Sequence, residues 1–572
     1  MEREIIDRDL FSKKENKKKL LSWERLSSWI HCICVVTFDL ELGQALEYTY
    51  PPTAVLLEED KTNICYLAFP DSNSGCMGDT RYHIRIRQAA GLSPQSPSSH
   101  HQLYNQKCPI FLQADSCYFY GFVYFRQVKD PSLPRGYFQK SVIVLSRLPF
   151  ISLFLEVIGL IAPEFFKSGF SSIEAACHEI NQWPLPFPGD TVSLPLLGTV
   201  IQAQIPSETY KSCSGTSSGV YNGLLSASTV LPSVHEINTF DCFVNFVHHI
   251  QLLWELVLIA EPIVVMASSP TKTSQMVQAL VSMIMPLMYY ADYRPYFTIH
   301  DSEFKEYTTR THAPPPIILG VTNPFFAKTL QHWPHILKVA DSTKPDALQK
   351  HKLKKGSNLK MLDCNPGLYT QYTSFLQKDK SIVKKLLKGI ETNRPSEVQS
   401  ALLRKYLLEL THSFMIPLER YMSTLMPLQK NISPYKAAPS PWPFNPDDFI
   451  ASLETSGPQL TSGIKGDWIG LYRRFFRSPN FSGWFNARYK GMSHKLQILQ
   501  LEALSDADLK DWVQGKQEVE VVDMILKIRC RLQQCESEEV PLSKEIRQQL
   551  QLRVDDIVCT LPDDLKTVLK TS

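Results

Sequence analysis

Apolar residues in the first third of the chain recur with the spacing of β-strands. Residues 29–50 begin with a β-rich apolar run, turn at Gly43 and resume. In residues 81–88, apolar side chains alternate with His83, Arg85 and Arg87, which is the pattern of a half-buried strand. The other expected elements are strands at 63–69, 117–128 and 141–148 and helices at 150–162 and 171–182. A sheet followed by helices predicts an α+β first domain.

The middle of the chain alternates between helix-like and strand-like runs. Residues 206–233 are rich in Ser, Thr and Gly, which is typical of a flexible linker and predicts the first domain boundary. The elements expected after it are a helix at 243–260, a strand at 262–267, a helix at 273–285, and strands at 295–299 and 316–320. Such alternation predicts an α/β domain with a largely parallel sheet. The basic, polar residues 344–360 predict a second boundary or a long loop.

From residue 379 onward the pattern becomes helical. Apolar positions 382, 383, 386, 387 and 390 share one face of a helix, and lysines at 384, 385 and 388 lie opposite. Pro395 can open a second helix that runs to about residue 428, with a kink expected at Pro417. Residues 431–446 are rich in proline, and the tail from about 493 is helical again. The chain should therefore combine α+β, α/β and helical parts.

Composition narrows the classes of function. The 572 residues suffice for roughly three or four domains. Lys and Arg number 60 against 57 Asp and Glu, a formal charge of +3, and this balance argues against a dedicated nucleic-acid binder. Charged residues and prolines interrupt the longest apolar runs, 142–162 and 250–267, so both are expected to be buried elements rather than membrane spans. The N-terminus has no apolar core of a signal peptide, which favours a cytoplasmic protein.

Motifs for covalent chemistry are weak or missing. The sequence contains no P-loop, no GxGxxG after a strand, no HExxH and no kinase signature. Residues 215–219 match the G-x-S-x-G pattern around Ser217, but they lie in the predicted linker and not between a strand and a helix. Cys32 and Cys34 have no second pair nearby to complete a zinc site, so they are expected to be buried thiols on one face of a strand. We therefore expect no metal and no cofactor.

Two basic stretches leave alternatives open. Residues 466–490 interleave Lys and Arg with aromatic residues, a pattern that can stack nucleic-acid bases. It also fits a helix whose Trp and Phe face the core while Arg473, Arg474 and Arg477 face outward, and the balanced overall charge favours this alternative, with a protein partner. The lysines of 344–360 fit a solvated loop or, less well, contact with an anionic membrane.

Several passages resemble the DENN-domain proteins, specifically the subfamily called DENN domain-containing protein 6. The resemblance runs in order along nearly the whole chain, and the thirty N-terminal residues lie outside it. The passages are HCICVVTFDLELGQALE (31–47), KTNICYLAFPDSNSGCMGDT (61–80), KSVIVLSRLPFISLF (140–154), LWELVLIAEPIVVMASSP (253–270), RPYFTIHDSEFKEYT (294–308), RPSEVQSALLRKYLLELTHSFMIPLERYM (394–422) and PQLTSGIKGDWIGLYRRFF (458–476).

The resemblance implies a tripartite DENN module. The expected order is a variable N-terminus (1–29), a longin-like upstream part (30–205), a linker (206–231), an α/β central part (232–357), a helical downstream part (359–482) and a helical tail (483–572). It implies guanine nucleotide exchange on a Rab GTPase, with Rab fourteen as the expected partner, and recruitment from the cytoplasm to recycling endosomes as a peripheral membrane protein. The chain would then not be an enzyme in the covalent-chemistry sense, because exchange proceeds by binding.

Residues that contact the GTPase are poorly visible to motif reading, since exchange needs no acid, base or metal from the exchange factor. From polarity and placement, the candidates are Asp292, Arg294, His300 and Asp301 and, more weakly, Arg473 and Arg474. A salt-bridged loop within the fold is an equally good explanation of the first four. Two other functions stay open: an effector that binds a small GTPase without exchanging its nucleotide, and a trafficking scaffold that uses the 344–360 lysines on anionic lipid.

Overall fold

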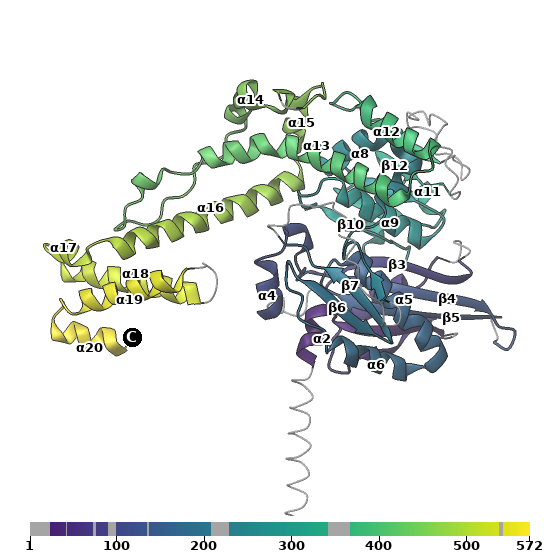
Figure 1. The fold of residues 1–572 in the computed structure, drawn as a ribbon, viewed down its shortest axis with the longest axis horizontal. Helices are drawn as coiled ribbons and strands as arrows, with labels where there is room; N and C mark the ends of the chain where they lie inside the picture. The colour runs from purple at the N-terminus through teal and green to yellow at the C-terminus, as the bar shows by residue number, and fades with distance from the viewer. Residues whose placement is uncertain are drawn as a thin grey trace, which may run out of the picture. The chain divides into compact units, whose positions relative to one another are not determined.

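The computed structural model (Figure 1) describes residues 23–39, 41, 43–71, 76–89, 99–133, 136–207, 228–309, 311–340, 366–460, 462–536 and 542–571. The chain divides into two compact units. One consists of Met1–His412 with Ile464–Asn480, and the other of Ser413–Gly463 with Phe481–Ser572. The first unit holds every strand of the three sheets, and the second is helical.

The N-terminal part of the first unit is built on an antiparallel sheet, here called the first sheet, with strand order β2-β1-β5-β4-β3. Gly43 begins the second strand with φ 77°, a conformation that costs glycine little. The strands are β1 (Cys32–Asp39), β2 (Gly43–Tyr50), β3 (Gly78–Arg87), β4 (Tyr118–Lys129) and β5 (Tyr137–Ser146). Their positions confirm the strands expected at 29–50, 81–88, 117–128 and 141–148.

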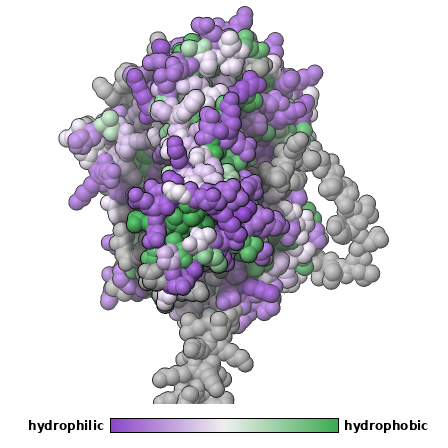
Figure 2. Space-filling model, turned by 90° about the vertical axis from the view of Figure 1, so that its left-hand side faces the viewer, coloured by the Kyte–Doolittle hydropathy of each residue, from purple (hydrophilic) through white to green (hydrophobic). Residues whose placement is uncertain are grey.

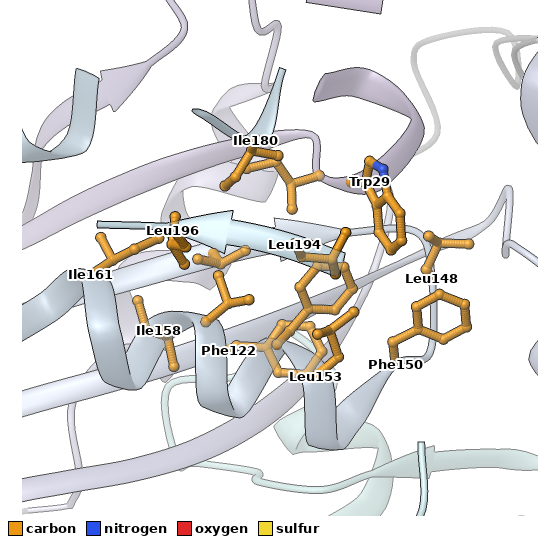
Figure 3. Packing of buried hydrophobic residues seen from close by; sticks show 14 of the residues in the cluster. Trp29, Phe122, Leu148, Phe150, Leu153, Ile158, Ile161, Ile180, Leu194 and Leu196 are labelled. Atoms are coloured by element: carbon orange, nitrogen blue, oxygen red, sulfur yellow. The ribbon is translucent and has the colours of Figure 1, made fainter. Parts of the chain in front are cut away.

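Helices and a small second sheet cover one face of the first sheet. The helices in this region are α2 (Glu24–Trp29), α4 (Ser99–Asn105), α5 (Ile151–Ser168) and α6 (Phe170–Ile180), and the second sheet is β6 (Thr191–Leu196), β7 (Thr199–Gln204) and β8 (Ser228–Val230). Figure 3 shows how Leu194 and Leu196 of β6 meet Ile158 and Ile161 of α5 in the shared core. Fully burying each such side chain stabilises the fold by about 1.5–3 kcal/mol.

The opposite face of the first sheet carries a separate hydrophobic cluster that includes Cys32 and Cys34. Both side chains are buried, and their sulfur atoms lie 3.7 Å apart. The hydrogen bond to Cys34, followed by burial, raises the pKa of the Cys32 thiol, so the thiol stays protonated at neutral pH. The prediction of two buried thiols on one face of a strand is confirmed.

Two expectations for the N-terminal part are wrong. The predicted strand at 63–69 is instead the second half of helix α3 (Glu58–Leu67). Three acidic residues in its first turn favour a helix N-terminus, and Ile64 and Leu67 lie three positions apart on its buried side. Strand β3 has no solvated face at its centre, because His83 and Arg85 are only 1% and 7% exposed. Helices α5 and α9 contact this strand and remove the solvent that the alternation implied.

The central part of the first unit carries a five-stranded sheet with order β10-β11-β9-β12-β13. All strands are parallel except β13, which pairs antiparallel at one edge, so the predicted largely parallel sheet is confirmed. The strands are β9 (Ile263–Met266), β10 (Asp292–Arg294), β11 (Ile317–Val321), β12 (His335–Lys338) and β13 (Gly367–Thr370). The helices are α7 (Thr239–Phe243), α8 (Ile250–Leu258), α9 (Pro270–Ser282), α10 (Phe304–Thr308) and α11 (Phe326–Thr329).

Three expectations for this region need correction. The helix expected at 243–260 is broken by a 3-10 turn, Val244–His249, between α7 and α8. The strand expected at 295–299 is wrong, because the pairing of β10 ends at Arg294 and Pro295 has no N–H to continue a ladder. Within the predicted linker, β8 pairs in parallel with β7 over Ser228–Val230, so the end of that stretch is structured. Residues 215–219 and 344–360 lie outside the described residues.

The rest of the chain is helical, as predicted. Helix α13 runs through Pro417 without a break, and it passes from the first unit into the second. The helices are α12 (Lys380–Glu391), α13 (Ser396–Thr424), α14 (Pro446–Ser456), α15 (Trp468–Phe475), α16 (Pro479–Asp506), α17 (Leu509–Val513), α18 (Glu518–Glu536), α19 (Lys544–Val558) and α20 (Asp563–Thr571). Taken together, the expected α+β, α/β and helical fold class is confirmed.

One face of the molecule is largely hydrophilic (Figure 2). In the face drawn in Figure 2, hydrophilic residues cover most of the area and hydrophobic residues show in limited places. None of the helices in the described part of the chain combines the length and the apolar character needed to cross a bilayer. The apolar run 142–162 forms the end of β5 and most of α5, and the run 250–267 forms α8 and β9. Both runs are therefore buried elements, as expected.

Candidate functional site

The N-terminal and central parts of the first unit meet where strand β3 lies beside α9 and β10 (Figure 1). The hydroxyl of Thr271, in the first turn of α9, donates to the backbone oxygen of Arg81 at 2.7 Å. Tyr296 comes from the central part, yet its ring belongs to the core on one face of the first sheet. Its hydroxyl donates to the backbone oxygen of Phe69 at 3.3 Å and accepts from the backbone N–H of Asp71 at 2.8 Å. The junction is therefore packed and hydrogen-bonded as a protein interior is.

Arg85 of β3 occupies the charged centre of this junction. Its Nη1 lies 2.6 Å from an oxygen of Asp292, and its Nη2 lies 3.5 Å from Asp115. The guanidinium carbon is 3.4 Å from the ring centroid of Tyr118 and 4.3 Å from that of Tyr293, both within cation–π range. Burial alone would lower the pKa of Arg85, but the neighbouring tyrosines and Asp292 raise it, so the charge is retained. Arg85 thus links the two parts through Asp292.

Asp292 and Arg294, two of the candidate GTPase contacts, belong to the same network. Arg294 is 5% exposed, its Nε lies 3.1 Å from Asp292, and its Nη2 pairs with Glu303. Burial alone would lower the pKa of Arg294, and the carboxylates of Asp292 and Glu303 raise it. A buried guanidinium with carboxylates on two sides stabilises the junction and is not presented to a docking partner. For these two residues the geometry matches the alternative of an ion-pair network within the fold.

His300 and Asp301 lie at the rim of the junction. The His300 ring is exposed and stacks on Tyr66 of α3, with ring centroids 5.0 Å apart and an interplanar angle of 17°. Asp301 is half-buried and accepts the backbone N–H of Glu303 at 3.0 Å, and burial raises the pKa of its carboxyl group. The His300 side chain is accessible to another protein, and Asp301 is partly accessible, although its charge also acts on Arg294.

Large apolar side chains precede His300 in the chain or contact the segment that follows it. Ile299 is 36% exposed and Phe325 is 50% exposed, and the Phe325 ring stacks with that of Phe304 at 6.4 Å. The backbone N–H of Phe304 donates to the backbone oxygen of Asp301 at 3.0 Å. This hydrogen bond connects the segment that stacks on Tyr66 with the segment that stacks on Phe325. We call this set of residues the junction surface: Tyr66, Ile299, His300, Asp301, Phe304 and Phe325. It draws on both parts of the first unit, and exposed aromatic groups of this kind are enriched among the energetic anchors of protein interfaces.

Arg473 and Arg474, the weaker candidates, lie on α15. Arg474 places Nη2 2.6 Å from an oxygen of Glu261, and the other oxygen of Glu261 is 3.6 Å from Nε2 of His335. Burial alone would raise the pKa of Glu261, but His335 and Arg474 hold it below its usual value. Arg473 is exposed, and within the described residues it forms no ion pair. The expected helix, with its aromatic face buried and its arginines outward, is confirmed.

The structure does not bring all candidates to one place. His300 and Asp301 follow β10, and Phe325 follows β11, so they lie beyond the carboxyl ends of the parallel strands. Glu261 precedes β9, so the pair it forms with Arg474 lies at the opposite, amino edge. Open α/β sheets bind their ligands beyond the carboxyl ends of the strands. This rule favours the junction surface over the α15 arginines.

Reading the sequence missed several residues that make the junction. Arg85 was expected on a solvated strand face, Tyr66 in a strand, and Tyr296 in a strand of the central sheet. A basic residue at the centre of an otherwise apolar strand was the available signal, because such a residue is either solvated or paired across an interface. Among the described residues, no three His, Cys, Asp or Glu side chains gather in a group that could hold a metal ion.

Comparison with known proteins identifies three matching families. The family model described as DENN (AEX-3) domain matches residues 137–339, DENND6 C-terminal domain matches 509–572, and Transport protein Avl9 matches 30–178.

Curated relatives match over most of their length. Protein DENND6A of Gallus gallus is 53% identical over 565 residues, covering 98% of this chain and 96% of that protein. Protein DENND6B of Homo sapiens is 54% identical over 550 residues, covering 96% and 94%. Protein DENND6 homolog of Dictyostelium discoideum is 32% identical over 601 residues, covering 92% and 80%. The similarity extends over almost the whole chain.

Proposed function

Because this chain belongs to the DENND6 family of DENN-domain proteins, we propose that it is a guanine nucleotide exchange factor for a Rab GTPase. The finer parts of the proposal follow the resemblance: Rab fourteen as the partner, and recruitment to recycling endosomes as the site of action. The division into DENN parts at 30–205, 232–357 and 359–482 belongs to the same proposal.

Nucleotide exchange of this kind is driven by the free energy with which the exchange factor binds the GTPase. The switch loops of a GTPase close over the nucleotide phosphates and Mg²⁺, and a protein that binds a displaced switch conformation disfavours the nucleotide. The exchange factor must therefore bind the nucleotide-free GTPase more tightly than the GDP-bound form. By reciprocity, the factor by which it weakens GDP equals the factor by which GDP weakens its own binding, and each tenfold corresponds to about 1.4 kcal/mol.

The observation that carries the proposal at residue level is the junction surface. It offers the exposed Ile299 and Phe325 of the central part together with the half-buried Tyr66 of the N-terminal part, and the network around Arg85 and Tyr296 joins these parts. A pre-ordered surface loses little conformational entropy on binding, which leaves more of the contact energy for displacing the switch loops. Of the candidates from sequence, His300 and Asp301 support this role, and Arg473 is a secondary prediction. The pair of half-buried Asp292 and buried Arg294 would act through the junction.

The decisive experiment is GDP release measured across a panel of Rab GTPases that includes Rab fourteen. We expect accelerated release for at least one member, and retention of that Rab on immobilised protein after removal of nucleotide with EDTA. Adding GDP or GTP with Mg²⁺ should elute it. Retention that is strongest with a non-hydrolysable GTP analogue, without faster GDP release from any Rab, would overturn the exchange proposal and favour the effector.

A pair of variants tests the surface itself. Phe325→Ser removes half-exposed aromatic area, and truncating an interface anchor of this kind costs about 2 kcal/mol or more, or roughly thirtyfold in affinity for the nucleotide-free Rab. Val398→Ser is the matched control, because Val398 is 51% exposed on α13, far along the chain from the junction surface. Equal affinity of both variants for the Rab would show that the GTPase binds elsewhere.

A further inference from the structure

Helix α12 and the residues that flank it present a strongly basic face. Residues 378–394 contain six bases and two acids, in a chain whose formal charge is only +3. All six basic residues are exposed: Lys378, Lys380, Lys384, Lys385, Lys388 and Arg394. Lys380, Lys384 and Lys388 are four positions apart, so they form one row along the helix.

Packing fixes the direction of this face. Ile382 and Leu386 are buried beneath the helix, and a Cβ at Gly389 would lie 2.0 Å from the side chain of Gln399 in α13. Gln399 in turn donates to the backbone oxygen of Leu386 at 3.0 Å, which ties the two helices together. The apolar side of α12 is thus committed to the fold, and the lysines must face outward.

These positive charges are not neutralised within the described part of the chain. None of the six basic residues forms an ion pair there. The Asp379 carboxylate is used as the N-cap of α12, accepting the backbone N–H of Ser381 at 2.8 Å. By contrast, exposed lysines elsewhere, such as Lys167, Lys405 and Lys527, each have a carboxylate three or four positions away on their own helix.

We propose that the basic face of α12 binds the anionic headgroups of a lipid bilayer. The chemistry favours a membrane over a single phosphate group, because five of the six bases are lysines. Lysine is a flexible, strongly hydrated point charge suited to a diffuse anionic surface, whereas arginine is the residue that grips one phosphate in a bidentate way. A row of cations on a helix with a buried apolar side can adhere to headgroups without inserting. This inference goes beyond nucleotide exchange and does not depend on it.

The test is co-sedimentation of the full chain with phosphatidylcholine vesicles, with and without phosphatidylserine, in the absence of any GTPase. We expect binding only to the anionic vesicles, and we expect it to be lost when salt rises from about 0.1 M to about 1 M, since the Debye length falls from about 10 Å to about 3 Å. Each basic residue near a membrane surface contributes about fivefold in partitioning. The triple variant Lys384→Ala, Lys385→Ala, Lys388→Ala should therefore bind about a hundredfold more weakly.

The matched control is Lys167→Ala, Lys405→Ala, Lys527→Ala, which removes the same charge from exposed positions outside α12. The control variant should bind anionic vesicles nearly as well as the unmodified chain does. Both triple variants should unfold at the same midpoint as the unmodified chain. Equal loss in both triple variants, or equal binding to neutral vesicles, would overturn the proposal. It would also fail if the α12 variant bound vesicles normally but lost nucleotide-free Rab in solution, because the face would then contact protein.

Discussion

Replacing Arg85 with methionine should destabilise the junction between the N-terminal and central parts. Methionine keeps most of the length of the side chain and removes the guanidinium, which is only 8% exposed and lies 2.6 Å from Asp292. The change leaves a carboxylate in a site that was built around a cation. It also removes the contacts with the rings of Tyr118 and Tyr293.

The size of the effect follows from the surroundings of Asp292. Removing one partner of a buried ion pair costs about 3–5 kcal/mol, because the other charge stays buried without compensation. Here the Asp292 side chain is 22% exposed and Arg294 remains, with Nε 3.1 Å from Asp292, so a loss no greater than the lower end of that range, about 3 kcal/mol, is expected. The double variant Arg85→Met, Asp292→Asn should recover part of the loss, since it no longer leaves a half-buried carboxylate without its Arg85 partner.

A urea titration followed by tryptophan fluorescence can measure this loss, since Trp29, Trp183 and Trp254 are buried in the first unit. The matched control is Arg126→Met in the neighbouring strand β4. Its partner Asp79 lies 2.6 Å away, but the two side chains are 24% and 38% exposed, and partly solvated pairs contribute only about 0–1 kcal/mol. A loss of less than 1 kcal/mol for Arg85→Met, or equal losses for both variants, would refute the argument that Arg85 fastens the junction.

Two further predictions concern glycine packing and pH. Gly320→Ala should cost about 1–3 kcal/mol in unfolding free energy, because the new Cβ would lie 2.2 Å from the backbone oxygen of Pro295. Gly491→Ala, in an open position on α16, should instead stabilise by about 0.5–1 kcal/mol, and the opposite order in thermal melts would contradict both. Burial lowers the pKa of His83 to about 3, so the unfolded chain takes up its proton first as pH falls below about 6.5. Between pH 7 and pH 5 the parent chain should lose about 2 kcal/mol more than His83→Leu, and parallel pH curves would count against this assignment.

The sequence predicted elements well where one local pattern decided the structure. The alternation around β3, the apolar run of β5 and the amphipathic α12 each matched the observed element. The predictions were wrong where a distant part of the chain determines whether a residue is buried or exposed. His83 and Arg85 alternate with apolar residues as on a solvated face, yet the helices packed on β3 bury them. An alternation of apolar and polar residues indicates a strand, but it does not indicate what packs against the second face of that strand.

The candidate site was only partly predictable for the same reason. Asp292 and Arg294 are polar residues at a strand, and polarity alone does not distinguish a surface contact from an ion pair inside the fold. The distinction depends on Arg85, which is 207 positions away from Asp292 in the chain. His300, only a few positions further on, is exposed, and Asp301 is half-buried at the edge of this network, where its charge acts on Arg294, so both remain candidates for contact with a GTPase.

A rigid junction also limits where the energy of exchange can come from. If the two parts moved freely, a GTPase binding across them would have to order them, and that cost would be taken from the contact energy. Instead, the ordering cost is met during folding by the inserted ring of Tyr296 and by the ion pairs that the buried Arg85 and Arg294 make with Asp292. If the chain exchanges nucleotide as we propose, the difference in affinity between nucleotide-free and GDP-bound GTPase would then arise from how well the junction surface fits each switch conformation. Loosening the junction should therefore slow GDP release even when the contact residues of the junction surface are unchanged.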